Sequence, residues 1–227
     1  MMLGRALCDL YRLPESLIFD IASLTGLAGL PKAGFTHDNA DLWGSRGYQE
    51  LRADKSVFHG KKVLFLIRDP KDILVSCYFH ATRRIDAYDG SISDFVRDTR
   101  FGICKVLAFH NIWYANRHVP GEFSLVRYED MHRLPDMAFR HALEFIGVRQ
   151  IDDDVFNRAV QHASFESMQR MERDQVVPST ILRPALVSDA ESYKVRRGRI
   201  GGHRDYLGHE DIRYIDAAVA ELGYPFG

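Results

Sequence analysis

The segment that runs from Val63 to Ser76 constrains the fold of this chain most strongly. It begins with Val-Leu-Phe-Leu-Ile, and five apolar residues without alternation are typical of a strand buried on both faces of a parallel sheet. Asp69 has the position of an N-cap and Pro70 that of the first residue of a helix. The segment therefore predicts an α/β fold in which Arg68 and the Ser76 hydroxyl lie near the carboxyl edge of the sheet, where such folds bind anions. A capped core helix after a solvated arginine is the alternative.

A second basic segment lies near the C-terminus. Residues 196–204 contain four arginines and three glycines. Glycines allow a tight backbone that exposes its amides to an anion, and guanidinium groups match phosphate oxygens in bidentate fashion. A disordered basic loop and an RNA-contacting patch are the alternatives. The formal net charge of −1 argues against RNA, so the segment favours a small phosphate site.

Together the two segments resemble motifs of the sulfotransferases that use 3′-phosphoadenylyl sulfate (PAPS). Arg68 and Ser76 match the family pattern Arg-Asp-Pro-x-Asp-x-x-x-Ser, whose arginine and serine bind the 3′-phosphate. Arg196, Arg197 and Gly198 are similar to the start of its Arg-Lys-Gly-x-x-Gly loop, with arginine in place of lysine. The Asp-Trp that often follows that loop is Gly-His here, which is a departure from the family.

Two further segments resemble the family's adenine-binding motifs. Tyr128 lies in Tyr-Glu-Asp-Met, and the family's tyrosine at this place lies near the adenine. Ser164 and Phe165 lie in a segment similar to Thr-Ser-Phe-x-x-Met, which covers the base. The four motifs occur in the family's order, so the resemblance implies that these residues bind the nucleotide.

The resemblance implies both a fold and an activity. The fold is the three-layer, P-loop nucleotide-kinase-like α/β fold, with a parallel sheet flanked by helices. The activity is transfer of a sulfo group from PAPS to a hydroxyl or amine of a small-molecule acceptor, which leaves adenosine 3′,5′-bisphosphate (PAP). The alternative is a non-catalytic, degenerate nucleotide-binding protein that keeps the 3′-phosphate site. A kinase is disfavoured because the Gly-x-x-x-x-Gly-Lys-Ser/Thr loop is absent from the sequence.

A general base is needed because the acceptor loses a proton when it attacks sulfur. A histidine, whose ordinary pKa is near neutrality, suits this task. The family places its base in a Thr-His segment, and the resemblance implies His37, which follows Thr36. A surface histidine after a short strand is the alternative.

The length of 227 residues suits one domain, and we expect residues 1–227 to form a single sulfotransferase-like domain. Hydrophobic patterning predicts strands at 33–37, 62–68 and 123–128. It predicts helices at 2–12, 15–25, 71–85, 91–99, 102–117, 136–146, 152–162, 165–173 and 209–222. Residues 177–192 have no clear periodicity, and we expect a long loop that closes over bound nucleotide.

The start of the chain departs from the family pattern. Sulfotransferases normally begin with a strand and a Pro-Lys-Ser-Gly-Thr-Thr-like loop, which holds the 5′-phosphosulfate, and a helix follows. Residues 1–8 are similar to the middle of that helix. We therefore expect an N-terminally truncated domain and a longer working protein. The alternative is a form that binds nucleotide weakly and catalyses poorly.

Composition sets the remaining expectations. The three cysteines, an odd number in apolar settings, predict reduced thiols and a cytoplasmic protein. No apolar run reaches the ~18 residues of a membrane span. No histidine, cysteine and carboxylate cluster has metal-ligand spacing, so we predict no metal. We expect a small-molecule acceptor as partner and neither nucleic acid nor membrane; the sequence does not indicate the oligomeric state.

Overall fold

The computed structural model describes residues 1–43, 46–176 and 182–226. The chain forms two compact units, and each is described by itself. Unit 1 contains Met1–Thr36, Leu64–Ile67 and Ser124–Val176, and unit 2 contains His37–Val63, Arg68–Phe123 and Val177–Gly227. The expectation of a single domain stays a prediction.

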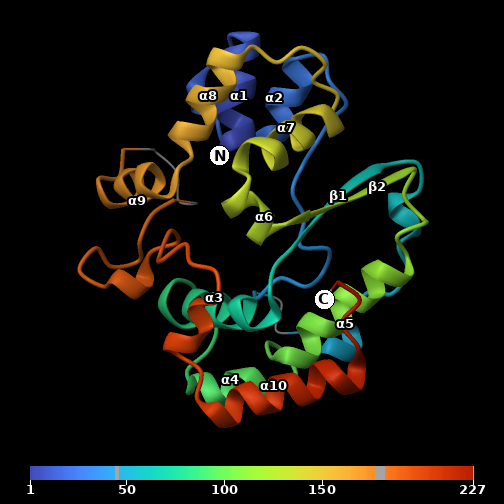
Figure 1. The fold of residues 1–227 in the computed structure, drawn as a ribbon, viewed down its shortest axis with the longest axis vertical. Coiled ribbons are helices and arrows are strands. Elements are labelled where there is room, and N and C mark those ends of the chain that lie inside the picture. Colours follow the sequence, from blue (N-terminus) through green and yellow to red (C-terminus); the bar gives the residue numbers. More distant parts are fainter. Residues whose placement is uncertain (44–45, 177–181, 227) are drawn as a thin grey trace. The chain divides into compact units, whose positions relative to one another are not determined.

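Helices alternate with two strands along the described residues (Figure 1). The α-helices are α1 (Met2–Tyr11), α2 (Ile21–Leu27), α3 (Pro70–Arg83), α4 (Ile92–Arg97), α5 (Ile103–Ala115), α6 (Tyr128–Arg133), α7 (Pro135–Phe145), α8 (Asp153–His162), α9 (Phe165–Arg173) and α10 (His209–Leu222). Short 3-10 helices lie at η1 (Glu15–Leu17), η2 (Tyr48–Glu50), η3 (Ser56–Phe58), η4 (Ala190–Ser192) and η5 (Gly202–Asp205). None of the helices in the described ranges has both the length and the apolar character that crossing a membrane requires.

The sheet pairs β1 (Lys62–Ile67) with β2 (Glu122–Arg127). An ion pair of 2.6 Å between Lys62 and Glu122 shows that the starts of the two strands lie together. Both strands run from there in the same direction (Figure 1). The predicted strands at 62–68 and 123–128 are therefore confirmed, as is the α/β class with a parallel sheet. Helices α3, α4 and α5 form the crossover between the strands, as parallel pairing requires.

Two predicted elements are wrong in detail, and one helix was not predicted. Residues 33–37 form no strand and do not pair with β1 or β2, because an apolar pattern alone cannot supply a pairing partner. The expected helix at 15–25 is divided into η1 and α2, because the Asp20 side chain accepts a hydrogen bond from the Ser23 amide and starts a new helix. Helix α6 (Tyr128–Arg133) is not among the predicted helices.

Unit 1 has a core of four packed helices. Helix α1 contacts α2, α7 and α8, and α6 contacts α7. The fully buried residues at the centre of this core are Ala6, Leu7, Leu24, Leu143 and Ala159. Gly4 is required in α1, because a Cβ there would lie 1.8 Å from the carbonyl oxygen of Ile18.

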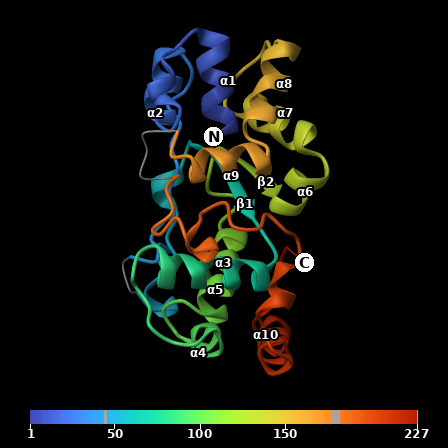
Figure 2. The same ribbon diagram turned by 90° about the vertical axis from the view of Figure 1, so that its left-hand side faces the viewer.

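Unit 2 has a separate core rich in aromatic side chains. Helix α3 contacts α4 and α5, and α10 contacts the same two helices (Figure 2). Phe95 and Phe101 are stacked with their ring centres 5.5 Å apart, and Tyr88 packs edge-on against both. Leu74 and Val75 of α3 are buried in this core. One face of α3 is therefore anchored inside unit 2, which leaves another face to carry the residues described next.

Candidate functional site

The site begins where β1 turns into α3. The Asp69 side chain accepts hydrogen bonds from the amides of Lys71 (2.9 Å) and Asp72 (3.1 Å). Pro70 is the first helical residue, where its missing N–H has no intrahelical partner to lose. The N-cap and the proline start predicted from the sequence are confirmed, and they place Arg68 directly before the helix.

Arg68 contacts the C-terminal arginine and glycine loop, residues 196–204. Its Nη2 donates to the carbonyl oxygen of Arg199 (3.2 Å) and lies 3.5 Å from Oδ2 of Asp72. Its side chain keeps 22 % of its surface exposed. The two basic segments on which the sequence analysis depended are therefore neighbours within unit 2.

Asp72 holds this loop against α3. Its carboxylate accepts hydrogen bonds from the Gly201 amide (2.8 Å), the His203 amide (2.9 Å) and Nδ1 of His203 (3.0 Å). Burial by itself raises the pKa of Asp72, but the hydrogen bonds from His203 and Gly201, together with the charge of Arg68, outweigh burial and keep the pKa below its usual value. Asp72 is therefore ionised at neutral pH. Asp72 is the second aspartate of the family pattern and His203 the histidine of the Gly-His departure, and no contact between them was predicted.

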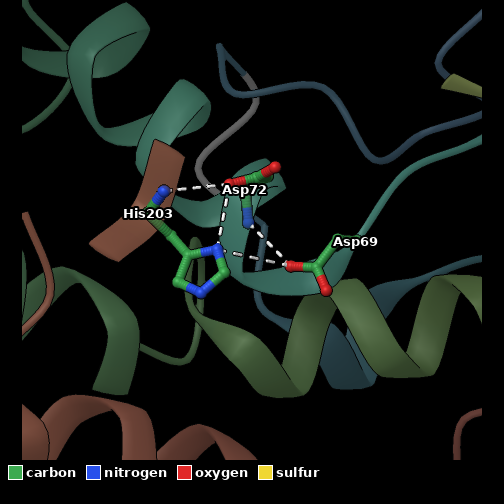
Figure 3. A group of neighbouring side chains, drawn as sticks. All are labelled: Asp69, Asp72 and His203. Atoms are coloured by element: carbon green, nitrogen blue, oxygen red, sulfur yellow. Dashed lines mark hydrogen bonds and ion pairs between the residues drawn. The ribbon is translucent and has the colours of Figure 1, made fainter. Parts of the chain in front are cut away.

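Asp69, Asp72 and His203 form a compact cluster (Figure 3). Their potential ligand atoms lie within 4.8 Å of one another. Oδ1 of Asp69 and both Asp72 oxygens already accept amide hydrogen bonds, and His203 Nδ1 faces both carboxylates at 3.0 and 3.8 Å. These hydrogen bonds give the cluster a structural task, so we assign no metal to it. The expectation that the chain binds no metal stays a prediction.

The arginines of the loop have different surroundings. Nη1 of Arg196 donates to Glu191 (2.8 Å) and to the Tyr206 hydroxyl (2.7 Å), and its guanidinium lies 4.1 Å from the ring centre of Phe79. Its side chain is only 14 % exposed. Arg197 is 47 % exposed and Arg199 60 %, and both lie 3.3 Å from Asp205. Arg196 is thus fixed in the unit, whereas the other two guanidinium groups face solvent.

Two glycines shape the loop. Gly198 has φ +55° and Gly201 has φ +73°. Both values lie in the left-handed region, which residues other than glycine, asparagine and aspartate rarely adopt. The turn at Gly201 directs its amide to Asp72. The glycines of this loop are therefore needed for its path, in addition to any contact that they make with an anion.

Ser76 lies on α3 one turn after Asp72, so both side chains share one face of the helix. Ser76 is exposed. The C-terminal segment contacts both ends of α3: Nη1 of Arg84, just after the helix, donates to the carbonyl oxygen of Ser192 (2.9 Å), and Arg68, just before it, donates to that of Arg199. Ser76 therefore lies between these two contacts along the helix, on the face that also carries Asp72.

The three residues expected at the adenine lie in unit 1. Tyr128 opens α6, and its ring centre lies 4.5 Å from that of His132. Ser164 caps α9 through its hydroxyl, which accepts from the Ser167 amide (3.2 Å), and Phe165 is the first residue of that helix. A helix cap explains Ser164 without a ligand. A role of these residues at the adenine stays a prediction.

His37 is exposed and belongs to unit 2. On α3, burial lowers the pKa of His80 to about 4, and the positive charges of Arg84 and Lys194 contribute to this shift. His80 is therefore neutral near pH 7.

Of the predicted loop at 177–192, residues 177–181 lie outside the described residues. Its end is fixed by Ser192, whose buried hydroxyl donates to the carbonyl oxygen of Leu186 (2.7 Å).

Comparison with known proteins identifies the family. Residues 53–225 match the model of the sulfotransferase domain, so the chain belongs to the sulfotransferase domain family. The match contains every residue predicted to bind nucleotide, while His37 precedes it.

The chain is similar to named sulfotransferases. It is 26% identical over 183 residues to cytosolic sulfotransferase 16 of Arabidopsis thaliana, covering 75% of this chain and 53% of that protein. It is 29% identical over 171 residues to sulfotransferase 1A1 of Mus musculus, covering 71% and 55%. The chain thus spans about half the length of the curated relatives that it matches.

Solved structures share the fold. Retinol dehydratase in complex with androsterone and the inactive cofactor PAP has a TM-score of 0.56 and 20% identity, over 74% of this chain and 50% of that one. Mouse sulfotransferase SULT7A1 in complex with PAP has a TM-score of 0.53 and 20% identity, over 72% and 58%. The chain therefore has the fold of the sulfotransferases.

Proposed function

We propose that this chain binds PAPS and transfers its sulfo group to a hydroxyl or amine of a small-molecule acceptor, with PAP as the product. The observation that carries the proposal is the contact between Arg68 and the arginine and glycine loop. Two guanidinium-bearing elements lie together there, on a helix N-terminus that itself favours anions. The retinol dehydratase and SULT7A1 structures contain PAP, and the former also holds androsterone, a small-molecule ligand.

The 3′-phosphate would be held by Arg68, Ser76, Arg197 and Gly198. Arg196 belongs to the same group and also fixes the loop through Glu191 and Tyr206. Tyr128, Ser164 and Phe165 would line the adenine site. Because Asp72 holds the loop before any nucleotide arrives, binding needs little ordering of the backbone.

In the reaction, the acceptor oxygen or nitrogen attacks sulfur in line with the bond from sulfur to the bridging phosphate oxygen. The new bond to sulfur forms as the bond to the bridging oxygen breaks, and PAP leaves with that electron pair. His37 takes the proton that the acceptor loses. The structure supports this role because the His37 side chain is exposed, where an acceptor can reach it.

A cytoplasmic location belongs to the same proposal. Cys8, Cys77 and Cys104 are free thiols, which fits a reducing compartment. Burial raises the pKa of the Cys77 thiol to about 11, so this thiol is protonated and unreactive near pH 7.

A transfer assay tests the activity. The chain is incubated with radiolabelled PAPS and a pool of phenols, alcohols, steroids and amines, and sulfated products are identified by mass spectrometry. His37→Ala should lower turnover while leaving the affinity for PAP unchanged. The matched control is His118→Ala, which removes another exposed histidine of unit 2 and should retain activity. Full activity of His37→Ala would show that His37 is not the base.

A further inference from the structure

His37 begins a tight turn with unusual backbone angles. Its carbonyl oxygen accepts a hydrogen bond from the Ala40 amide (2.9 Å), and the two central residues, Asp38 and Asn39, have φ values of 43° and 71°. Positive φ at both central positions defines a type I′ turn, which glycine, asparagine and aspartate tolerate best. For aspartate and asparagine, unlike glycine, the left-handed conformation still costs free energy and persists where neighbouring contacts hold it.

A buried ion pair holds this turn. Nζ of Lys55 lies 2.7 Å from Oδ2 of Asp38, and the two side chains are only 1% and 7% exposed. The Lys55 ammonium also donates to the carbonyl oxygen of Arg52 and lies 5.2 Å from the ring centre of the buried Trp113. The ammonium therefore has a fixed position inside unit 2, and it fixes the residue directly after His37.

A second buried ammonium holds the continuation of the same segment. Nζ of Lys105, on α5, donates to the carbonyl oxygens of Asp41 (3.3 Å) and Arg46 (3.1 Å). Burial lowers the pKa of Lys105. Lys55 thus holds the Asp38 side chain, and Lys105 holds the backbone carbonyls of Asp41 and Arg46, on the C-terminal side of His37, while the His37 side chain stays exposed.

We propose that Asp38 and Lys55 are positioning residues for His37. Burying an ion pair is costly, and an apolar pair would fill the same space as well or better. This ion pair lies directly after an exposed histidine, in a turn with two left-handed residues. Its presence is explained if it keeps the His37 imidazole in one place. The proposal rests on the proposed role of His37 as the base.

The test compares two identical substitutions. Asp38→Asn removes the charge from this pair but keeps a residue that tolerates the turn. Asp211→Asn removes the charge from another buried carboxylate of unit 2, whose Oδ1 lies 2.5 Å from Nη1 of the partly exposed Arg97. Both substitutions remove a buried carboxylate, so a general loss of stability would affect both. Lys55→Met provides a second variant if Asp38→Asn does not fold.

Two readouts follow each variant. The first is the NMR signal of His37 in protein labelled at histidine, identified by its loss in His37→Ala. In Asp38→Asn this signal should move toward that of an unstructured histidine, and in Asp211→Asn it should not. The second is sulfo transfer: turnover of Asp38→Asn should fall about 10- to 100-fold, as expected for a displaced catalytic group, with the affinity for PAP unchanged.

The outcomes separate the two proposals. An unchanged His37 signal in Asp38→Asn and in Lys55→Met, or equal losses of turnover in Asp38→Asn and Asp211→Asn, would overturn the positioning role. Full turnover of His37→Ala would instead overturn the base assignment. The NMR readout decides the positioning role even where transfer is undetectable.

Discussion

Asp72 and His203 lie 131 residues apart in the sequence and are joined by two hydrogen bonds, from the amide (2.9 Å) and from Nδ1 (3.0 Å) of the histidine. The same carboxylate accepts from the Gly201 amide. A single aspartate in the first turn of α3 thus fixes the path of a distant loop. That loop is the one whose arginines are proposed to bind the 3′-phosphate, so its shape is set by α3.

Replacing Asp72 with alanine should destabilise unit 2. The variant loses several hydrogen bonds to a charged acceptor at once, and each is worth about 1.5–3 kcal/mol. Because neighbouring contributions are not additive, we expect the free energy of unfolding to fall by about 2–4 kcal/mol. Urea denaturation measures this change. The control is Asp216→Ala. Asp216 lies on α10 and is the exposed ion-pair partner of Lys71, which neighbours Asp72 on α3, so its replacement should lower the free energy of unfolding by at most about 1 kcal/mol. Equal effects of the two substitutions would contradict the anchoring role of Asp72.

Arg196→Ala and Arg197→Ala should differ in their effect on stability. Arg196 loses contacts with Glu191, Tyr206 and the Phe79 ring, so its replacement should lower the free energy of unfolding by about 1–3 kcal/mol and also weaken PAP binding. Arg197 is half exposed, and its replacement should weaken PAP binding with little change in stability. Denaturation and calorimetric titration of both variants check this difference. A stability loss for Arg197→Ala as large as that for Arg196→Ala would contradict it.

His110 should make the chain less stable as the pH falls from about 6.5 to about 4. Burial lowers the pKa of His110 to about 4, so in this range the unfolded chain binds a proton that the folded chain does not. The contribution of neutral His110 to the free energy of unfolding is therefore fully present above the pKa of this histidine in the unfolded chain. It is lost as the pH falls toward the pKa of His110 in the folded chain. The full loss amounts to about 3 kcal/mol.

The variant His110→Leu isolates this contribution. Its free energy of unfolding should depend less steeply on pH than that of the unmodified chain when both are measured by urea denaturation near pH 7 and near pH 4.5. The acid response of Asp72 is common to both proteins and cancels in the comparison. Parallel pH dependences would show that His110 is not neutral in the folded state.

Local patterns in the sequence predicted the part of the site that is local in structure. The apolar run of β1, the Asp69 cap and Pro70 together determine where α3 starts, and each acts over a few residues. The meeting of Arg68 with the loop followed from the family resemblance, and the two are in contact. The α/β class and most helices were predicted for the same local reasons.

The errors and omissions concern partners that are distant in sequence. Asp72 is a position of the family motif and resembles an acidic residue that stabilises a helix N-terminus, but the sequence does not show that its partners are Gly201 and His203. Arg196 could not be separated from Arg197, because its burial depends on Phe79 and Tyr206. Residues 33–37 have the composition of a strand, but a strand exists only where another pairs with it.

The central claim is that Arg68 and the arginine and glycine loop form one site for a 3′-phosphate. The most direct test is calorimetric titration of the chain and of Arg68→Ala with PAP and with adenosine 5′-monophosphate, which lacks that phosphate. Lys71→Ala is the control, because Lys71 is a neighbouring cation that pairs with Asp216. We predict that the unmodified chain and Lys71→Ala bind PAP more tightly than adenosine 5′-monophosphate. Arg68→Ala should lose about 1.5–3 kcal/mol of PAP binding free energy, which lowers the affinity for PAP about 10- to 150-fold, while the affinity for the monophosphate changes little. Equal affinity of the unmodified chain for the two nucleotides, or an unchanged preference in Arg68→Ala, would contradict the account.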